Sequence, residues 1–252
     1  MIMPIGDDNT GRTIRPFVTY ALIAANILVF VLFQGMGGND KFTYSFSTVP
    51  REIVTGEDQV TADRDVEHPI TGQPVSVPGL QPTPISVYIT LLTSMFMHGG
   101  IAHLLGNLLF LWIFGDNVED TLGHLRYFMF YLVCGLIASL AHVFTTVAFS
   151  GAGGEESLIP SLGASGAISG VLGGYIMLHP HRRVTVFMFR MLTHVPAFVA
   201  IGLWFLFQLV SGLGVLGEGT QAGGVAYAAH IGGFIAGLVL IRLFAIGRHG
   251  RD

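Results

Sequence analysis

Long apolar runs separated by polar stretches dominate the chain, and this pattern predicts helices that cross a membrane. A helix needs about 20 apolar residues to span the hydrocarbon core of a bilayer. The fourth run is short and rich in glycine, so we expect it to begin inside the membrane after a re-entrant segment. The pattern predicts an all-α polytopic membrane protein, a bundle of six transmembrane helices with a short fourth helix. The six runs cover residues 17–33, 101–114, 125–149, 165–178, 195–215 and 225–246.

Three polar segments lie outside these helices. Residues 1–16 precede the first run, which is too long for the core of a cleaved signal peptide, so we interpret it as an uncleaved span. The loop 34–86 is long and holds six prolines, which predicts partly ordered structure on the outer membrane surface. Residues 247–252 form a short tail. We therefore expect one membrane domain, 17–246, with a cytoplasmic segment at each end.

Composition supports the membrane assignment and excludes other classes. Apolar residues make up 51% of the chain and charged residues 11%, whereas a soluble domain carries about 25% charged residues. The expected surroundings are therefore a lipid bilayer. No basic stripe is present, so we expect no nucleic-acid partner. Cys134 is the one cysteine, which excludes a disulfide within the chain.

Basic residues set the expected orientation, because the cytoplasmic loops of membrane proteins are enriched in Lys and Arg. Six spans place both termini on one side, and nine of the twelve Lys and Arg residues fall on that side. The other three lie in the loop 34–86, where charge has little influence on orientation. We expect a multi-pass protein of the cytoplasmic membrane with both termini in the cytoplasm. The nine are Arg12, Arg15, Arg126, Arg182, Arg183, Arg190, Arg242, Arg248 and Arg251.

Polar side chains interrupt three of the apolar segments at a similar depth. At about 1.5 Å per helical residue, His103, Ser165 and His230 each lie ~18–24 Å from the cytoplasmic end of their helix. Polar groups inside a membrane are costly and often mark function. We therefore expect a common water-filled cavity that opens outward and is lined partly by His98 and Ser169. The segments read "HGGIAHLLGN", "GASG" and "AHIGGFIAG".

Glycine patterns predict that two of these helices pack closely. Gly233 and Gly237 share a helical face with His230, and small residues let membrane helices approach each other. The fourth helix carries a matching ridge that begins beside Ser165. If the ridges meet, the Ser165 hydroxyl reaches the His230 imidazole, which can take its proton and create a nucleophile. The matching ridge is Gly166, Gly170 and Gly174.

The second helix offers groups that can stabilise an oxyanion. His103 and Asn107 are four residues apart and share a face, and both can donate hydrogen bonds. The backbone N–H of Ser165 is a third donor, because the first turn of a helix leaves its N–H groups unpaired. Gly163 and Gly166 permit a close approach on either side of the serine. No carboxylate lies at this depth, so the prediction is a Ser–His dyad rather than a triad.

Other interpretations of these residues fare less well. His98 and His103 are five residues apart, a poor spacing for one helical face, and no His-Glu-x-x-His pattern is present. We therefore predict no metal and no cofactor. A serine and glycine cluster often serves only packing, and an isolated histidine such as His142 is often structural, so His142 receives no role. A solute transporter that relays protons through histidines is disfavoured by the absence of mid-span carboxylates and of internal repeats.

Taken together, these residues resemble the rhomboid family of intramembrane serine proteases, over most of the chain. The serine motif of the family resembles Gly163 to Gly166, and its sixth-helix pattern resembles Ala229, His230, Gly233 and Gly237. The second-helix His-x-x-x-Asn pattern resembles His103 and Asn107, with His98 before it. The run "GDNVEDTLG", Gly115 to Gly123, resembles the segment that follows the second helix in the family, with Glu119 at its acidic position.

The resemblance implies a rhomboid-like bundle that cleaves single-span membrane proteins near a weakened part of their helix. It implies Ser165 as nucleophile, His230 as base, and a fifth helix, with Trp204 and Phe205, that gates lateral access. Two features depart from the family: the first loop has no Trp, and Ser169 stands where some members carry Tyr. The alternative function is a catalytically inactive rhomboid-like protein that binds membrane clients, although such relatives typically lack the serine or the histidine.

Overall fold

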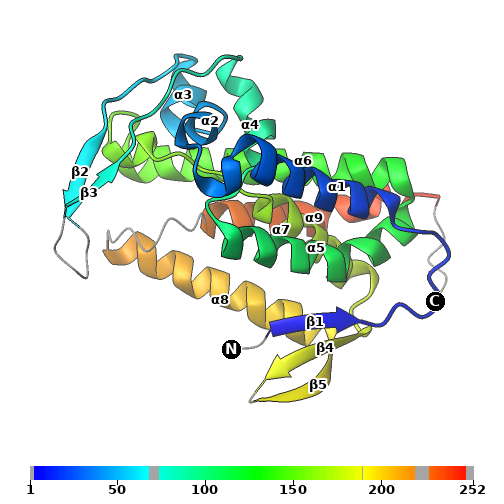
Figure 1. The fold of residues 1–252 in the computed structure, drawn as a ribbon. Coiled ribbons are helices and arrows are strands. Elements are labelled where there is room, and N and C mark those ends of the chain that lie inside the picture. The colour runs from blue at the N-terminus through cyan, green and yellow to red at the C-terminus, as the bar shows by residue number, and fades with distance from the viewer. Residues whose placement is uncertain (1–2, 68–73, 189, 219–226, 248–252) are drawn as a thin grey trace.

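The computed structural model describes residues 3–67, 74–188, 190–218 and 227–247 (Figure 1). Helices occupy all six predicted apolar segments, and the first continues past its α-helical part as a π-helical turn, Val29–Phe33. The predicted start of the sixth segment at 225–226, the loop 219–224 and the tail 248–252 lie outside the described residues. The α-helices in these six segments are α1 (Phe17–Leu28), α5 (Ile101–Leu122), α6 (His124–Ser150), α7 (Ser165–Leu178), α8 (Ala197–Glu218) and α9 (Tyr227–Phe244).

Helix α7 lies at the centre of the bundle. It contacts α5, α6 and α9 (Figure 1), and every residue from Gly166 to Tyr175 is buried. Glycine and other small side chains make this possible, because they leave room for neighbouring backbones on several sides. Larger side chains of the surrounding helices, such as Phe114, Phe130 and Phe234, complete the core.

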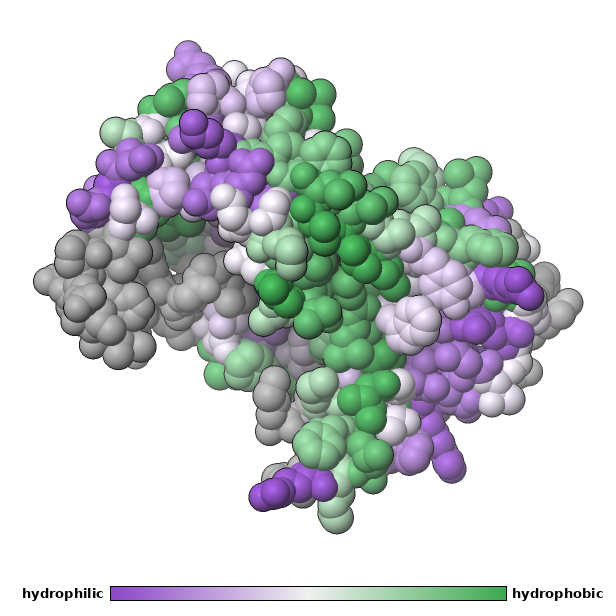
Figure 2. Space-filling model, in the orientation of Figure 1, coloured by the Kyte–Doolittle hydropathy of each residue, from purple (hydrophilic) through white to green (hydrophobic). Residues whose placement is uncertain are grey.

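The outer surface of the bundle is apolar. Hydrophobic residues form a broad band across the face in Figure 2, between hydrophilic regions on either side. Among the described residues, three helices are long and apolar enough to cross a membrane: Ile101–Leu122, His124–Ser150 and Tyr227–Phe244. The remaining apolar helices, Phe17–Phe33, Val87–Phe96, Ser165–Leu178 and Ala197–Gly212, are shorter. The molecule is therefore a multi-pass helical membrane protein.

Helix α5 runs to Leu122, eight residues beyond the predicted end at Phe114. The sequence-based boundary was too early because the polar residues of this stretch are stabilised by the N-terminal segment. The buried Glu119 carboxylate accepts hydrogen bonds from the N–H groups of Val18 and Thr19, at 2.9 and 2.8 Å. These donors belong to the first turn of α1, where N–H groups lack partners within the helix. Glu119 thus fixes the start of α1 against the end of α5.

The all-α prediction omits a small antiparallel sheet of three strands. It consists of β1 (Met3–Asp7), β4 (Arg183–Met188) and β5 (Met191–Pro196), in the order β1-β4-β5. Alternation explains the sheet, because Val184 and Val186 point into the core while their neighbours do not. The predicted start of the fifth apolar helix at residue 195 is therefore wrong by two residues, since β5 ends at Pro196 and α8 begins at Ala197.

The long loop after α1 is partly ordered, as predicted. It holds short helices and a two-stranded ribbon: α2 (Asp40–Ser45), α3 (Pro50–Thr55), β2 (Arg64–Glu67), β3 (Pro74–Val77) and α4 (Thr90–Thr93), with single 3₁₀ turns at Gly35–Gly37, Val87–Ile89 and Ser94–Phe96. Thr48 and Ser161 exchange backbone hydrogen bonds of 3.0 and 2.8 Å. This bridge attaches the loop to the segment that leads into α7.

Candidate active site

Ser165 is the first residue of α7, and the segment before it is held in an unusual conformation. Gly163 has a φ of +127°, a backbone conformation that residues with a side chain rarely adopt. Its N–H donates to the carbonyl of Ser94 at 2.9 Å. A Cβ on Gly163 would lie 2.9 Å from Cε1 of His103 and 3.7 Å from Oγ of Ser165. Glycine at position 163 therefore allows both the His103 ring and the Ser165 hydroxyl to lie close to its backbone.

The structure places Ser165 Oγ 2.7 Å from His230 Nε2, across the interface between α7 and α9. Close backbone packing produces this distance. A Cβ on Gly233 would lie 2.1 Å from the carbonyl oxygen of Gly166, which leaves no space for any side chain there. The two glycine ridges therefore face each other as the sequence predicts, and they bring the hydroxyl and the imidazole within hydrogen-bond distance.

Two polar side chains of α5 are the predicted donors of the oxyanion site. The Gly99 N–H donates to His103 Nδ1 at 3.3 Å, which leaves the Nε2 of a neutral ring to carry the proton and act as a donor. Asn107 is one turn further along and buried, and its Nδ2 has no hydrogen-bond partner among the described residues. A buried amide without a partner is costly. His103 thus offers a donor beside Gly163, and Asn107 stays the predicted second donor, one turn along the same helix, while the N–H of Ser165 begins α7.

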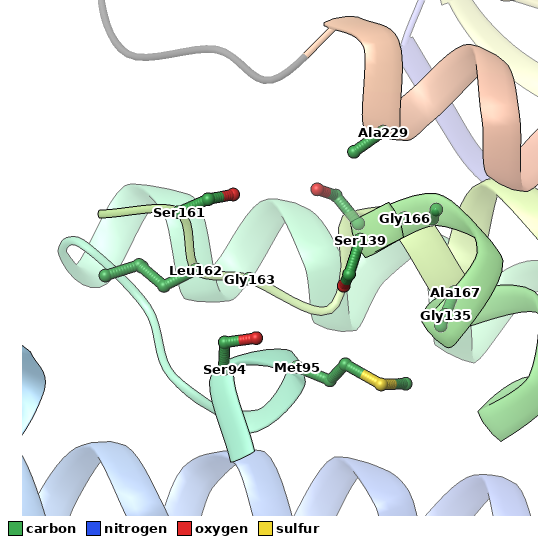
Figure 3. A pocket seen from close by; sticks show the side chains of 12 residues that line it. Ser94, Met95, Gly135, Ser139, Ser161, Leu162, Gly163, Gly166, Ala167 and Ala229 are labelled. Atoms are coloured by element: carbon green, nitrogen blue, oxygen red, sulfur yellow. The ribbon is translucent and has the colours of Figure 1, made fainter. Parts of the chain in front are cut away.

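A cavity of about 20 Å³ lies beside Ser165, large enough for one water molecule. Figure 3 shows Ser94 and Ser161 on either side of the segment Leu162–Gly163 in its wall. His98 and Ser169, which were expected to line a cavity at the site, are not among the residues that line this one. Ser169 is fully buried and donates to the carbonyl of Ser165 at 2.6 Å. The polar wall comes from serines: Ser94, Ser139, Ser161 and Ser165.

His98 packs against His103 next to the candidate site. Its ring is buried and meets the His103 ring edge-on, with 5.2 Å between the centroids. The Gln34 side chain holds its backbone, because Gln34 Nε2 donates to the His98 carbonyl and the His98 N–H donates to Gln34 Oε1. Among the residues that the structure describes, no three His, Cys, Asp or Glu side chains lie close enough to share a metal ion.

The sequence analysis missed one polar partner of the histidine. His230 Nδ1 lies 2.8 Å from Oε1 of Gln208, a buried residue of α8. The signal was present in the sequence, because Gln208 is the one amide in the otherwise apolar run 197–210. An amide, unlike a carboxylate, can serve as a third group without bringing a charge into the membrane.

Comparison with known proteins agrees with this geometry. A family model described as the Rhomboid domain matches residues 86–246. Rhomboid protein 1, mitochondrial, of Saccharomyces cerevisiae is 33% identical over 164 residues, which cover 64% of this chain and 43% of that protein. Rhomboid protease GluP of Bacillus subtilis is 28% identical over 237 residues, 94% of this chain and 36% of that protein. RHOMBOID-like protein 4 of Arabidopsis thaliana is 34% identical over 161 residues, which cover 63% of this chain and 34% of that protein.

The chain spans less than half the length of these relatives, between 34% and 43%. The family match nevertheless covers most of the chain, from just before α4 to just beyond α9, and includes Ser165, His230, His103 and Asn107. The chain belongs to the rhomboid family.

Proposed function

We propose that the chain is an intramembrane serine endopeptidase that cleaves single-span membrane proteins within or near their transmembrane segment. The observation that carries this proposal is the 2.7 Å contact between Ser165 Oγ and His230 Nε2 inside an apolar helical bundle. A serine hydroxyl becomes an effective nucleophile when an adjacent base takes its proton. Family membership supports the assignment, since one relative carries the name of a protease.

In the first step His230 Nε2 accepts the hydroxyl proton while Ser165 Oγ bonds to the carbonyl carbon of the scissile peptide. The carbonyl oxygen becomes an oxyanion. The proposed donors are the side chain of His103, which lies against Gly163, the side chain of Asn107, whose amide nitrogen has no partner among the described residues, and the backbone N–H of Ser165. Donors that are oriented before the reaction stabilise developing charge at little cost. The imidazolium then protonates the leaving nitrogen, the C–N bond breaks and an acyl-enzyme remains.

Hydrolysis of the acyl-enzyme needs one water molecule close to the ester. The cavity beside Ser165 has about the volume of one water and a wall of serine side chains, and such polar surroundings can hold water in an otherwise apolar interior. His230 takes a proton from this water as its oxygen bonds to the carbonyl carbon. The C–Oγ bond then breaks, and the proton returns to Ser165. The cycle therefore needs no metal and no cofactor.

The orientation in the bilayer is part of the proposal. The positions of Lys and Arg favour a cytoplasmic membrane with both termini in the cytoplasm. The membrane domain then covers 17–246, with the segment 1–16 and the tail 247–252 on the cytoplasmic side, and the loop 34–86 on the outer side. The α7 terminus that bears Ser165 faces outward, so substrates are cut towards the outer side of the membrane.

The test is cleavage of a single-span substrate by the purified protein in proteoliposomes. Ser165→Ala and His230→Ala are each expected to abolish cleavage, because both lose the nucleophile–base pair. Ser150→Ala is the control, since Ser150 bonds only to backbone carbonyls near the far end of α6. Full activity of Ser165→Ala would show that the nucleophile is assigned wrongly.

A fluorophosphonate probe distinguishes the protease from the inactive, client-binding alternative. The probe forms a covalent adduct with an activated serine, so mass spectrometry of the wild-type protein is expected to locate it on Ser165. A folded wild-type protein that binds a single-span client but gains no adduct and cuts nothing would support the alternative.

A further inference from the structure

Gln208 is buried within the otherwise apolar run 197–210 of α8. Its neighbours Phe207 and Val210 are 63% and 62% exposed, whereas Gln208 is 6% exposed. Inside a membrane an amide is costly to bury without a partner. A buried amide on the inner face of α8 therefore calls for a partner, and His230 on α9 is that partner.

The two nitrogens of the His230 ring have different neighbours. Nε2 lies 2.7 Å from Ser165 Oγ, and Nδ1 lies 2.8 Å from Gln208 Oε1. A neutral imidazole carries one proton, on one nitrogen, and accepts with the other. To accept the serine proton, Nε2 must be unprotonated, so the ring proton belongs on Nδ1. The carbonyl oxygen of an amide is a suitable acceptor for that proton.

We propose that Gln208 is a positioning residue, which holds His230 in the tautomer with Nδ1 protonated and turns Nε2 towards Ser165. This inference rests on the proposed protease function and extends it from a Ser–His pair to a Ser–His–Gln array. The role resembles that of the third group in serine hydrolases, which orients the base without touching substrate. A neutral amide does so without adding a charge to the apolar interior.

The aromatic neighbours of the imidazole cannot replace this contact. The rings of Trp204 and Tyr227 lie with centroids 6.1 and 6.5 Å from that of His230. They restrict where the ring sits, but within the described part of the chain the ring nitrogens bond to Gln208 and Ser165 and to neither aromatic residue. Without the Gln208 carbonyl, the Nδ1 proton would be buried without an acceptor, which favours the other tautomer. In that tautomer Nε2–H faces the serine, and the base is lost.

The arrangement also makes the base dependent on the position of α8. Gln208 belongs to α8, whereas His230 and Ser165 belong to α9 and α7. A shift of α8 away from α9 would separate Oε1 from Nδ1, so the proposed tautomer depends on the packing of α8 against α9.

The experiment compares three variants with the wild type. Gln208→Met removes the acceptor but keeps the length of the side chain. Gln208→Glu keeps a carbonyl oxygen at the same reach, in either protonation state. Phe207→Leu changes an exposed neighbour on the same helix and serves as the control. Cleavage of a single-span substrate in proteoliposomes gives kcat and KM, and ¹⁵N NMR of protein labelled at histidine gives the tautomer of each ring, with His230→Asn assigning the His230 signals.

We expect wild-type His230 to be protonated on Nδ1. In Gln208→Met the signals should move towards the Nε2–H tautomer, and kcat should fall about 10- to 100-fold, the size found for partners that orient histidines at metal sites. KM should stay within about twofold, because Gln208 does not touch substrate, and Gln208→Glu should restore both the tautomer and most of kcat. Phe207→Leu should match the wild type in all readouts.

Several outcomes would overturn the inference. One is a Gln208→Met protein with wild-type kcat and tautomer, and another is a rise in KM alone, which would indicate a substrate contact. A wild-type ring protonated on Nε2 would also contradict it. A wild-type protein that cuts nothing would contradict the proposed protease instead, and the NMR comparison would still decide whether Gln208 sets the tautomer.

Discussion

Gly237 lies directly against the carbonyl oxygen of Gly170, so closely that a Cβ on Gly237 would fall 2.0 Å from that oxygen. The obstacle is backbone, which cannot rotate away as a side chain would. This contact lies on the α7–α9 interface, below the pair of residues proposed to carry the chemistry. The distance between hydroxyl and imidazole therefore depends on glycines one and two turns away from them.

Gly237→Ala should force α7 and α9 apart. Overpacking of this kind costs about 1–3 kcal/mol, and the displacement also lengthens the contact between Ser165 and His230. We expect a lower Tm in detergent and reduced cleavage. Gly202→Ala is the matched control, because a Cβ on this helical glycine of α8 meets nothing within 4 Å. Equal stability of the two variants would show that the helices do not pack as described.

Gly163→Ala should impair the oxyanion site. The φ of +127° disfavours alanine, and its Cβ would press on the His103 ring at 2.9 Å. Displacing one oxyanion donor costs roughly 10²- to 10³-fold in kcat, so a loss of at least this order is expected. Gly153→Ala, in an exposed loop with open space around it, should behave as wild type. The prediction fails if Gly163→Ala retains its kcat.

Glu119→Gln should loosen the attachment of α1. The carboxylate accepts from Val18 N, Thr19 N, Thr19 Oγ1 and His124 Nδ1, and an amide would turn an N–H₂ group towards some of these donors. Hydrogen bonds to charged groups contribute about 1.5–3 kcal/mol, so we expect a Tm lower by roughly 3–12 °C. Glu155→Gln, an exposed change elsewhere, should leave the Tm unaltered. Thermal unfolding followed by intrinsic fluorescence distinguishes the two.

Glu52 should make stability depend on pH. This residue of α3 is buried, and burial raises its pKa from 4.5 to about 7. Because the folded state favours the protonated form, the stabilisation is complete below pH 4.5 and is lost as the pH rises through 7. The wild-type Tm should therefore fall between pH 5 and pH 8 by more than that of Glu52→Gln. If the two proteins show the same pH dependence, Glu52 titrates normally; Glu57→Gln, an exposed change nearby, should resemble the wild type.

The positions of the helices follow closely from hydropathy, and the pairing of α7 with α9 follows from glycine spacing. Hydropathy can be read from short windows of sequence, and glycine spacing repeats regularly along a helix, so both signals are visible in the sequence alone. The meeting of Ser165 and His230 was predictable for the same reason, since each residue begins a glycine ridge. His103 was placed correctly by its depth alone.

Three features could not be predicted from the sequence, because they depend on contacts between distant segments. Strand β1 pairs with β4 across most of the chain, and a five-residue strand carries too little alternation to be recognised alone. The end of α5 looked like a loop because Glu119 is polar, although α1 satisfies it. Gln208 was overlooked because an amide in an apolar helix indicates that a polar partner exists, but the sequence does not identify which residue that partner is.

The pairing of β1 with β4 imposes an order on folding during translation. Met3 pairs with Phe187, and Asp7 with Val184, so the first strand emerges long before its partner exists. The hydrogen bonds that Tyr175 and Asn117 donate to the Asp7 carboxylate can likewise form only after both of these residues have been synthesised. Strand β1 thus stays unpaired while the four long helices between it and β4 are inserted, and it can pair with the hairpin only afterwards.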